Sequence, residues 1–247
     1  MLNDLLLLSG NDVPFIEAQV NIHQPSIKEI AYIGEESFFI GCELLGFSKK
    51  NLSEKEQAQL TEYSDLDVFL MMFQGLMPAE LKRQKQSVDN VLMLLFPNYE
   101  ISFNERGILL RNEKEEKYLD NSNFPIFQKM VKQMFNLNRD NTQNDEYNPG
   151  GDLAKSIVKK LEERKRKLAE QSKSADGKIN ILCRYVSILS VGQQKDMNSL
   201  LQYTVYQLFD EFQRYELKMQ ADYNFQARMA GAKDLPEIED WMKDIHA

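Results

Sequence analysis

The chain has 247 residues, of which 43% are apolar and 28% charged, as in soluble proteins with one large or two smaller domains. Its net charge of −8 argues against a general nucleic-acid-binding protein, which needs a basic surface to neutralise phosphates. The two cysteines, Cys42 and Cys183, lie far apart in sequence and indicate no disulfide framework, so a reducing intracellular setting fits best.

The first 40 residues predict short helices and strands whose ends are marked by capping residues and glycine. Met1–Leu8 is apolar but too short to span a bilayer, and it lacks the basic start of a signal peptide, so we expect a strand or a short packed segment. Phe15–His23 alternates imperfectly and predicts a strand. Ser26 and Glu29 have the spacing of a capping box. We therefore expect two short helices that meet at Gly34.

The middle of the chain predicts an apolar helix, a second apolar run, a hairpin and an amphipathic helix. The segment Ser64–Leu76 is apolar enough to be buried on most sides, and Val88–Phe96 is a second apolar run that Pro97 stops. A hairpin is expected at 99–111, because a four-residue loop that ends in Gly107 separates two apolar runs. The apolar side chains of 124–135 then recur along one side of a helix, behind a cap at 121–123.

A polar stretch that ends in Asn-Pro-Gly-Gly divides the chain, and the pattern beyond it is helical. We expect a mixed α/β N-terminal domain at 1–140, a linker at 141–151 and a helical C-terminal domain at 152–247. The fold class is α+β, mostly α. One long helix is expected after the N-cap Asp196. Its apolar stripe, which is core-facing or coiled-coil-like, consists of Leu201, Val205, Leu208, Phe212, Tyr215, Met219 and Tyr223.

Motifs for catalysis, metals and nucleotides are missing from the sequence. Of the two histidines, His246 is next to last, so a nucleophilic dyad would depend on His23, and no GxSxG or catalytic-cysteine context accompanies it. No spacing of His and Cys indicates zinc, and no glycine-rich loop indicates a nucleotide. The paired carboxylates lie at helix starts or on exposed helix faces. We therefore expect no enzyme, no catalytic or metal-binding residues and no cofactor.

A basic run, Arg164–Lys167, could contact phosphates. The alternative is a solvated helix face, because Glu162 and Glu163 precede Arg166 and Lys167 at the favourable spacing of four. The run has no interleaved aromatic residues and the chain is acidic overall, so we favour the solvated face and expect no nucleic-acid partner.

The candidate partner-binding residues are aromatic or methionine side chains. Methionine is flexible and polarizable, and it recurs on surfaces that accommodate varied partners. The competing interpretation is a plain helix core, or own-domain docking in the case of the single tryptophan. The candidates are Phe38, Phe39, Met71, Met72, Phe73 and Trp241.

Several stretches together resemble the tail assembly chaperone-like proteins of long-tailed phages and prophages of Gram-positive bacteria. They are packing motifs and touch both halves of the chain. The stretches are Pro25–Ile30 running into Ile33–Phe39, Met197–Leu201 leading into Tyr203–Leu208 and Asp210–Phe212, and the ending Ala230–Leu235 with Glu239–His246.

The resemblance implies a role in phage tail assembly. Such proteins bind the long helical tape measure protein, keep it soluble and help tail tube subunits to assemble around it, and the family offers no catalytic residues. The expected location is then the cytoplasm of the bacterial host, and self-association through the long helix is a further expectation. Two alternatives stay open: a structural virion component such as a neck or baseplate adaptor, and a DNA-binding regulator that uses 159–167.

Overall fold

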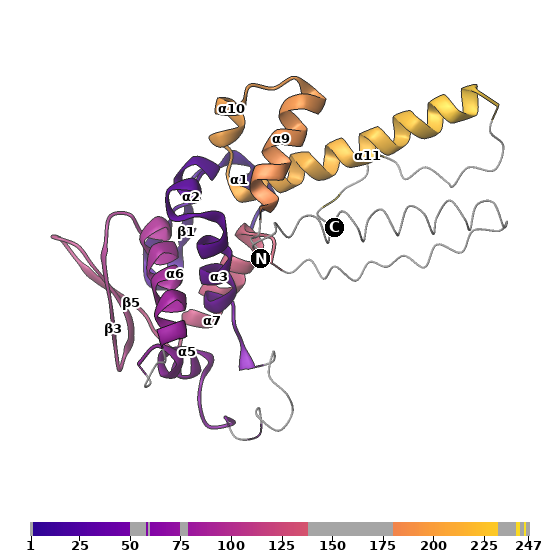
Figure 1. Ribbon diagram of the computed structural model, residues 1–247. Helices are drawn as coiled ribbons and strands as arrows, with labels where there is room; N and C mark the ends of the chain where they lie inside the picture. The colour runs from indigo at the N-terminus through magenta and orange to yellow at the C-terminus, as the bar shows by residue number, and fades with distance from the viewer. Residues whose placement is uncertain are drawn as a thin grey trace.

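A computed structural model describes residues 2–49, 58, 60–74, 79–137, 180–231, 241, 242 and 245, without the side chains of 72–74 and 79–83. The described part is α+β and mostly α, as the sequence predicts. Its N-terminal half contains short strands and helices, and the described elements after residue 180 are helices. Figure 1 shows a body of packed helices, with a small sheet on one side and the helix α11 projecting from the other.

Asn3 begins a helix where the sequence predicts a strand or a short packed segment. Its side chain accepts a hydrogen bond from the Leu5 amide, which caps the helix α1 (Asp4–Ser9). The single strand expected at 15–23, in contrast, is wrong. That stretch is split into β1 (Val13–Phe15), the 3-10 turn η1 (Ile16–Ala18) and β2 (Val20–Ile22), and β1 pairs with β2.

The capping box at Ser26 is present and begins α2 (Ile27–Ile33). The Ser26 amide donates to a Glu29 carboxylate oxygen over 2.7 Å, and the Glu29 amide donates to the Ser26 hydroxyl over 3.2 Å. Gly34 has a φ of 85°, which the chain needs in order to turn from α2 into α3 (Glu35–Leu45). Two helices therefore meet at Gly34, as predicted.

The centre of the body is a helical layer against a three-stranded antiparallel sheet of order β3-β4-β5. The expected hairpin is confirmed with a two-residue turn, and a third strand, which the sequence pattern did not indicate, extends it. The elements are α5 (Asp65–Gln74), α6 (Ala79–Leu95), β3 (Glu100–Asn104), β4 (Gly107–Arg111), β5 (Glu116–Leu119) and α7 (Phe124–Met134).

Phenylalanine rings fill the core between these elements. Phe127 stacks on Phe15 at a centroid distance of 6.2 Å and lies 5.8 Å from Phe96, and the Phe69 and Phe124 rings lie 5.3 Å apart. These rings are buried, so each contributes a large apolar area to stability. One core therefore joins β1, α5, the end of α6 and α7.

The predicted long helix is present, but it begins later than expected. Asp196 caps the separate short helix α10 (Met197–Leu201), which follows α9 (Ile181–Gln193). Thr204 then begins α11 (Val205–Met229) with a capping box: the Gln207 amide donates to the Thr204 hydroxyl over 3.3 Å, and the Thr204 amide donates to the Gln207 side-chain oxygen over 2.8 Å. The apolar stripe therefore continues across residues 202–204, where the chain leaves α10 and starts α11.

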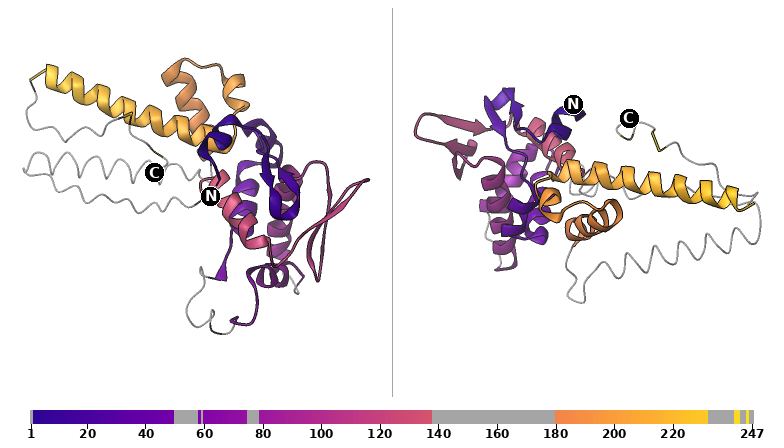
Figure 2. Two further views of the ribbon diagram at one scale, coloured as in Figure 1. Left: turned by 180° about the vertical axis from the view of Figure 1, so that it is seen from behind. Right: turned by 90° about the horizontal axis from the view of Figure 1, so that it is seen from above.

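The two halves of the described chain share one cluster of buried side chains. The Ile27 amide donates to the Tyr203 carbonyl over 2.8 Å, and the Tyr206 hydroxyl donates to Asp4 over 2.8 Å. Figure 2 shows from two sides that α9 and α10 lie against the body near α1 and α2, while most of α11 extends beyond it. The predicted linker at 141–151 lies outside the described residues, and the division into two domains stays a prediction.

Candidate interaction surface

Phe38 and Phe39, two of the predicted partner-binding residues, are buried in α3. The Phe38 side chain is fully buried, and Phe39 is 8% exposed. The Phe38 ring packs edge-on against Phe39 at a centroid distance of 5.5 Å and against Phe135 at 5.0 Å. These rings hold α3 in the core and offer a partner almost no surface in this conformation.

The predicted methionine cluster of α5 is partly described. Met71 is 46% exposed, whereas Leu66 and Phe69 on the same helix are buried. The side chains of Met72 and Phe73 lie outside the described part of the chain. In the described part, α5 is therefore mainly a core helix with one exposed methionine.

Trp241 lines an open cavity of about 770 Å³ along α11. The indole side chain is partly exposed, and the Trp241 carbonyl accepts a hydrogen bond from the Arg214 guanidinium over 3.0 Å. The cavity combines aromatic, apolar and charged side chains from the C-terminal helices with Leu8 of α1. Its lining is Leu8, Gly192, Gln193, Tyr203, Gln207, Asp210, Glu211, Arg214, Tyr215, Lys218, Met219 and Trp241.

Local contacts at the start of α11 fix the inner end of this cavity. The Gln207 side-chain amide donates to the Leu8 carbonyl over 2.7 Å, which ties α11 to α1. Lys195 forms an ion pair with Glu211, and its ammonium lies 3.0 Å from the Tyr203 hydroxyl. Partial burial lowers the pKa of Lys195, but hydrogen bonds to Glu211 and Tyr203 outweigh it, and the pKa is raised. Lys195 therefore stays charged and connects its own loop to Glu211 of α11 and to Tyr203.

The inner part of the apolar stripe packs α9 against α11. The Tyr185 ring stacks on Phe212 with a centroid distance of 3.7 Å and an interplanar angle of 5°, and it meets Phe209 edge-on at 5.2 Å. A Cβ at Gly192 would overlap the Tyr215 ring, so only glycine admits that ring so close to α9. These positions confirm that the inner stripe faces the core, whereas Tyr223, the last residue of the predicted stripe, is 64% exposed.

The outer half of α11 exposes apolar side chains to solvent. The cavity-lining positions 211, 214 and 218 continue at helical spacing to 222, 225 and 229, so these residues share one face of the helix. Phe225 is 64% exposed and Met229 is 76% exposed. On the same face, Lys218 forms an ion pair of 2.6 Å with Asp222.

The α11 surface consists of Arg214, Lys218, Phe225, Met229 and Trp241. Arg214, Lys218 and Trp241 line the cavity together with the carboxylates of Asp210 and Glu211. Phe225 and Met229 lie beyond the cavity, on the same helix face as Arg214 and Lys218. Exposed apolar groups next to a groove are typical of protein-binding sites. Phe225 and Met229 are absent from the residues that the sequence predicts for binding, although their spacing of seven and eleven from Lys218 was visible in the sequence.

His23, the residue on which a nucleophilic dyad would depend, contacts two carboxylates. Its Nδ1 lies 2.9 Å from Asp12, and its Nε2 lies 3.3 Å from Glu29. Both ring nitrogens of His23 therefore face carboxylates in this structure. Across the residues that the structure describes, no three His, Cys, Asp or Glu side chains are grouped so as to hold a metal ion.

The described helices include none that combines the length and the apolar character needed to cross a bilayer. The basic run Arg164–Lys167 lies outside the described residues. The α11 surface is therefore the best-defined candidate site in the described part of the chain.

Comparison with known proteins finds one family. The model of the YomV second domain matches residues 173–246, which include α9, α10, α11 and Trp241. YomV is a Bacillus prophage protein, so this match indicates a protein of phage origin. No curated protein and no solved structure matches the chain. The matched segment contributes every residue of the α11 surface and, apart from Leu8, the whole lining of its cavity.

Proposed function

We propose that this protein is a phage tail assembly chaperone whose α11 surface binds apolar helical segments of the tape measure protein in the cytoplasm of the host. The protein makes and breaks no covalent bonds in this role. It covers apolar stripes of its partner until tail tube subunits assemble around them.

The observation that carries this proposal is the exposure of Phe225 and Met229 on the outer half of α11, which projects from the body (Figure 1). Their spacing of four places them next to each other on one helix face. A partner helix with apolar residues at the same spacing would bury both side chains, as in helix-in-groove recognition. The phage-derived family match covers the same segment, and the family resemblance of the sequence supplies the tape measure protein as the partner.

The charges beside these side chains are mixed. Arg214 and Lys218 line the cavity together with the carboxylates of Asp210 and Glu211. Lys218 also forms an ion pair with Asp222. Apolar contact with Phe225 and Met229, rather than the net charge of the surface, is therefore the basis on which a partner helix is recognised.

Co-expression tests the proposal. The soluble fraction of a tape measure fragment is measured with the protein, without it, and with the variant Phe225→Ser/Met229→Ser. We expect the wild-type protein to raise solubility and the variant to lose most of this effect. The matched control is Leu5→Ser/Ile16→Ser, because these side chains are 74% and 79% exposed but lie on α1 and η1.

Two results would contradict the proposal. One is equal aggregation of the fragment with and without the protein. The other is abundant recovery of the protein from purified particles, which would instead identify a structural virion component.

A further inference from the structure

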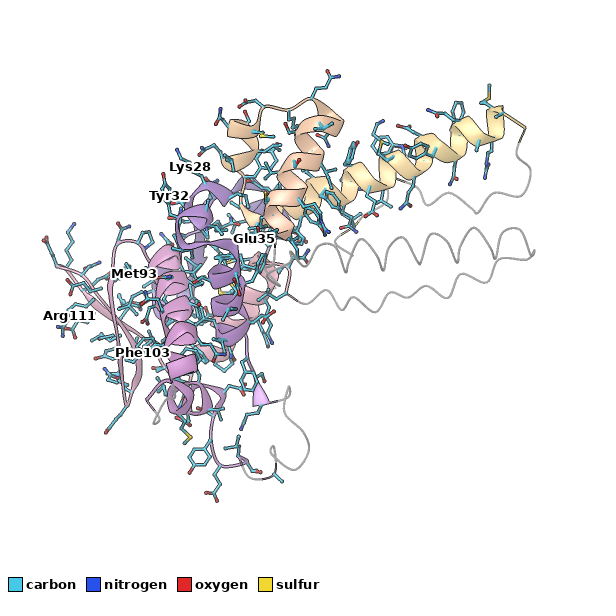
Figure 3. All side chains as sticks on the ribbon, in the orientation of Figure 1. Lys28, Tyr32, Glu35, Met93, Phe103 and Arg111 are labelled. Atoms are coloured by element: carbon cyan, nitrogen blue, oxygen red, sulfur yellow. The ribbon has the colours of Figure 1, made fainter. Side chains whose placement is uncertain are left out.

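A second groove, separate from the α11 surface, runs between α6 and β3. Its volume is about 890 Å³. Lys85, Gln86, Asp89 and Met93 line it from one face of α6, and the consecutive residues 99–103 line it from β3. Figure 3 labels Met93 and Phe103 on these two neighbouring elements. Consecutive lining residues are expected when a groove follows the edge of a strand, because one face of a strand offers only every second residue.

The strand register shows which backbone amide and carbonyl groups of β3 lack a partner in β4. β3 lies at the end of the order β3-β4-β5, and among the described strands only β4 pairs with it. Asn104 opposite Gly107 closes the two-residue turn and is a hydrogen-bonded pair, so hydrogen-bonded and non-hydrogen-bonded pairs alternate from there. Ile101 opposite Leu110 is a non-hydrogen-bonded pair. The Ile101 amide and carbonyl therefore point away from β4, toward the groove.

The groove walls add apolar contact and negative charge. Met93 is 62% exposed, so an occupant of the groove could bury a large part of its side chain. Asp89 and Glu100 contribute two carboxylates against the single cation Lys85. Partial burial raises the pKa of Asp89, and the nearby Lys85 offsets this only in part. A cation bound beside Asp89 would relieve the cost of its buried charge.

We propose that this groove binds an extended segment of a partner protein, which adds to the edge of β3 as a further strand. The segment hydrogen-bonds to the Ile101 backbone, packs an apolar side chain against Met93 and places a lysine or arginine beside Asp89. This strand-addition site differs in kind from the α11 surface, which receives a helix, and it stands whether or not the tail chaperone role is correct.

Fluorescence anisotropy of the full-length protein with short peptides tests the proposal. The probe is a fluorescein-labelled peptide of sequence Lys-Val-Thr-Val-Lys-Val, and we expect saturable binding with a Kd below about 1 mM. Methylation of alternate backbone nitrogens removes the strand hydrogen bonds but keeps every side chain. We expect this change to weaken binding about tenfold or more. Replacement of both lysines by glutamate should weaken it by a similar factor.

Protein variants test the same contacts from the other side. Asp89→Asn should weaken binding about threefold to tenfold, as expected for a partly exposed ion pair. Ile101→Pro removes the edge amide at a position where an edge strand tolerates proline, and it should weaken binding about tenfold. Circular dichroism checks that this variant is folded. If it is not, the N-methylated peptide tests the other hydrogen bond of the pair, in which a peptide amide donates to the Ile101 carbonyl. Leu5→Ser on α1, which is exposed and lines neither site, is the control and should bind as the wild type does.

Three outcomes would overturn the proposal. The first is the absence of saturable binding of the probe up to about 1 mM. The second is equal affinity for the N-methylated peptide, which would exclude strand addition. The third is equal or tighter binding of the glutamate peptide, which would exclude the ion pair with Asp89.

Discussion

Glu35 connects the two halves of the chain through one carboxylate. It lies in the first turn of α3, yet its oxygens accept hydrogen bonds from the amides of Leu182, over 2.8 Å, and Cys183, over 3.4 Å. The N-cap residue of α9, Asn180, makes no side-chain capping bond, so Glu35 takes this role from 147 residues away. Burial raises the pKa of Glu35, and the amides only partly offset this.

Removal of the Glu35 carboxylate should therefore destabilise the contact between α3 and α9. We expect Glu35→Ala to lower the free energy of unfolding by about 1–2 kcal/mol, as for other lost N-caps. Glu36→Ala is the matched control, because Glu36 is exposed in the same turn. Urea unfolding measures both variants, and equal losses would contradict the capping role.

Asp67 makes stability depend on pH at the start of α5. The Ser64 hydroxyl and amide donate to its carboxylate over 2.6 Å and 2.8 Å, and these bonds lower the pKa of Asp67 below its usual 3.8. A folded pKa below the unfolded one adds stability above pH 3.8, and this stability is lost as the pH falls through the folded pKa. Thermal unfolding of wild type and Asp67→Asn should differ at neutral pH and converge in acid. A constant difference would contradict this account.

The sequence pattern predicted features that depend on residues close together in the chain. Ser26 and Glu29 lie three positions apart, so their capping box was visible in the sequence. Glu35 and α9 are distant in sequence, and no local pattern indicates that contact. Phe38 and Phe39 have the composition of a binding surface, but neighbouring helices bury them. Composition alone does not separate a core aromatic residue from an exposed one.

At the scale of elements, the pairing of α3 with α6 depends on Gly41. A Cβ at this position would overlap the Ser87 carbonyl and lie 2.6 Å from the Val91 Cγ2. The two helices therefore approach more closely at Gly41 than a larger residue allows. The Ser37 and Ser87 hydroxyls, 3.0 Å apart, add a polar contact across the same pair.

Gly41→Ala should destabilise the protein by about 1–3 kcal/mol, because overpacking of the helix contact outweighs the gain of about 1 kcal/mol in helix propensity. Gly46→Ala, at the end of α3, is the control. The nearest atom to a Cβ there belongs to the flexible Lys132 side chain, so we expect a small effect. Equal stability of wild type and Gly41→Ala in thermal unfolding would contradict the close approach.

The periodicity of apolar residues predicted whether most elements are helices or strands, but it did not predict where each element begins and ends. The apolar stripe that includes Leu201 and Val205 runs through the break at 202–204, so it suggested a single helix from Asp196. The capping box of Thr204 and Gln207 marks the true start of α11. The strand expected at 15–23 fails for a related reason: Gln19 adopts a φ of 54°, and the chain turns back there to pair with itself.

At the scale of the whole molecule, the shared core predicts that the described halves unfold together. Leu92 of α6 and Leu208 of α11 are both fully buried and belong to one cluster. Leu92→Ala and Leu208→Ala should each lower stability by about 2–5 kcal/mol. Circular dichroism and a fluorescent label on the exposed Cys183 should report the same urea midpoint in each variant. Separate transitions would show that the halves fold independently.

The overall arrangement also separates two kinds of partner site. The α11 surface lies on the projecting helix, and β3, which lines the second groove, lies on the opposite side of the body (Figure 2). One site offers side chains at helical spacing, and the other offers a strand edge. The two sites can therefore bind different segments without competing for the same surface.

Photo-crosslinking in cells that produce the tape measure protein tests the central claim most directly. A photoreactive phenylalanine analogue is placed at Phe225, which is 64% exposed, in one variant and at Ile16, which is 79% exposed, in another. The account predicts a covalent adduct with the tape measure protein from position 225 and little or none from position 16. The absence of an adduct at 225, or equal adducts at both positions, would contradict binding through the α11 surface.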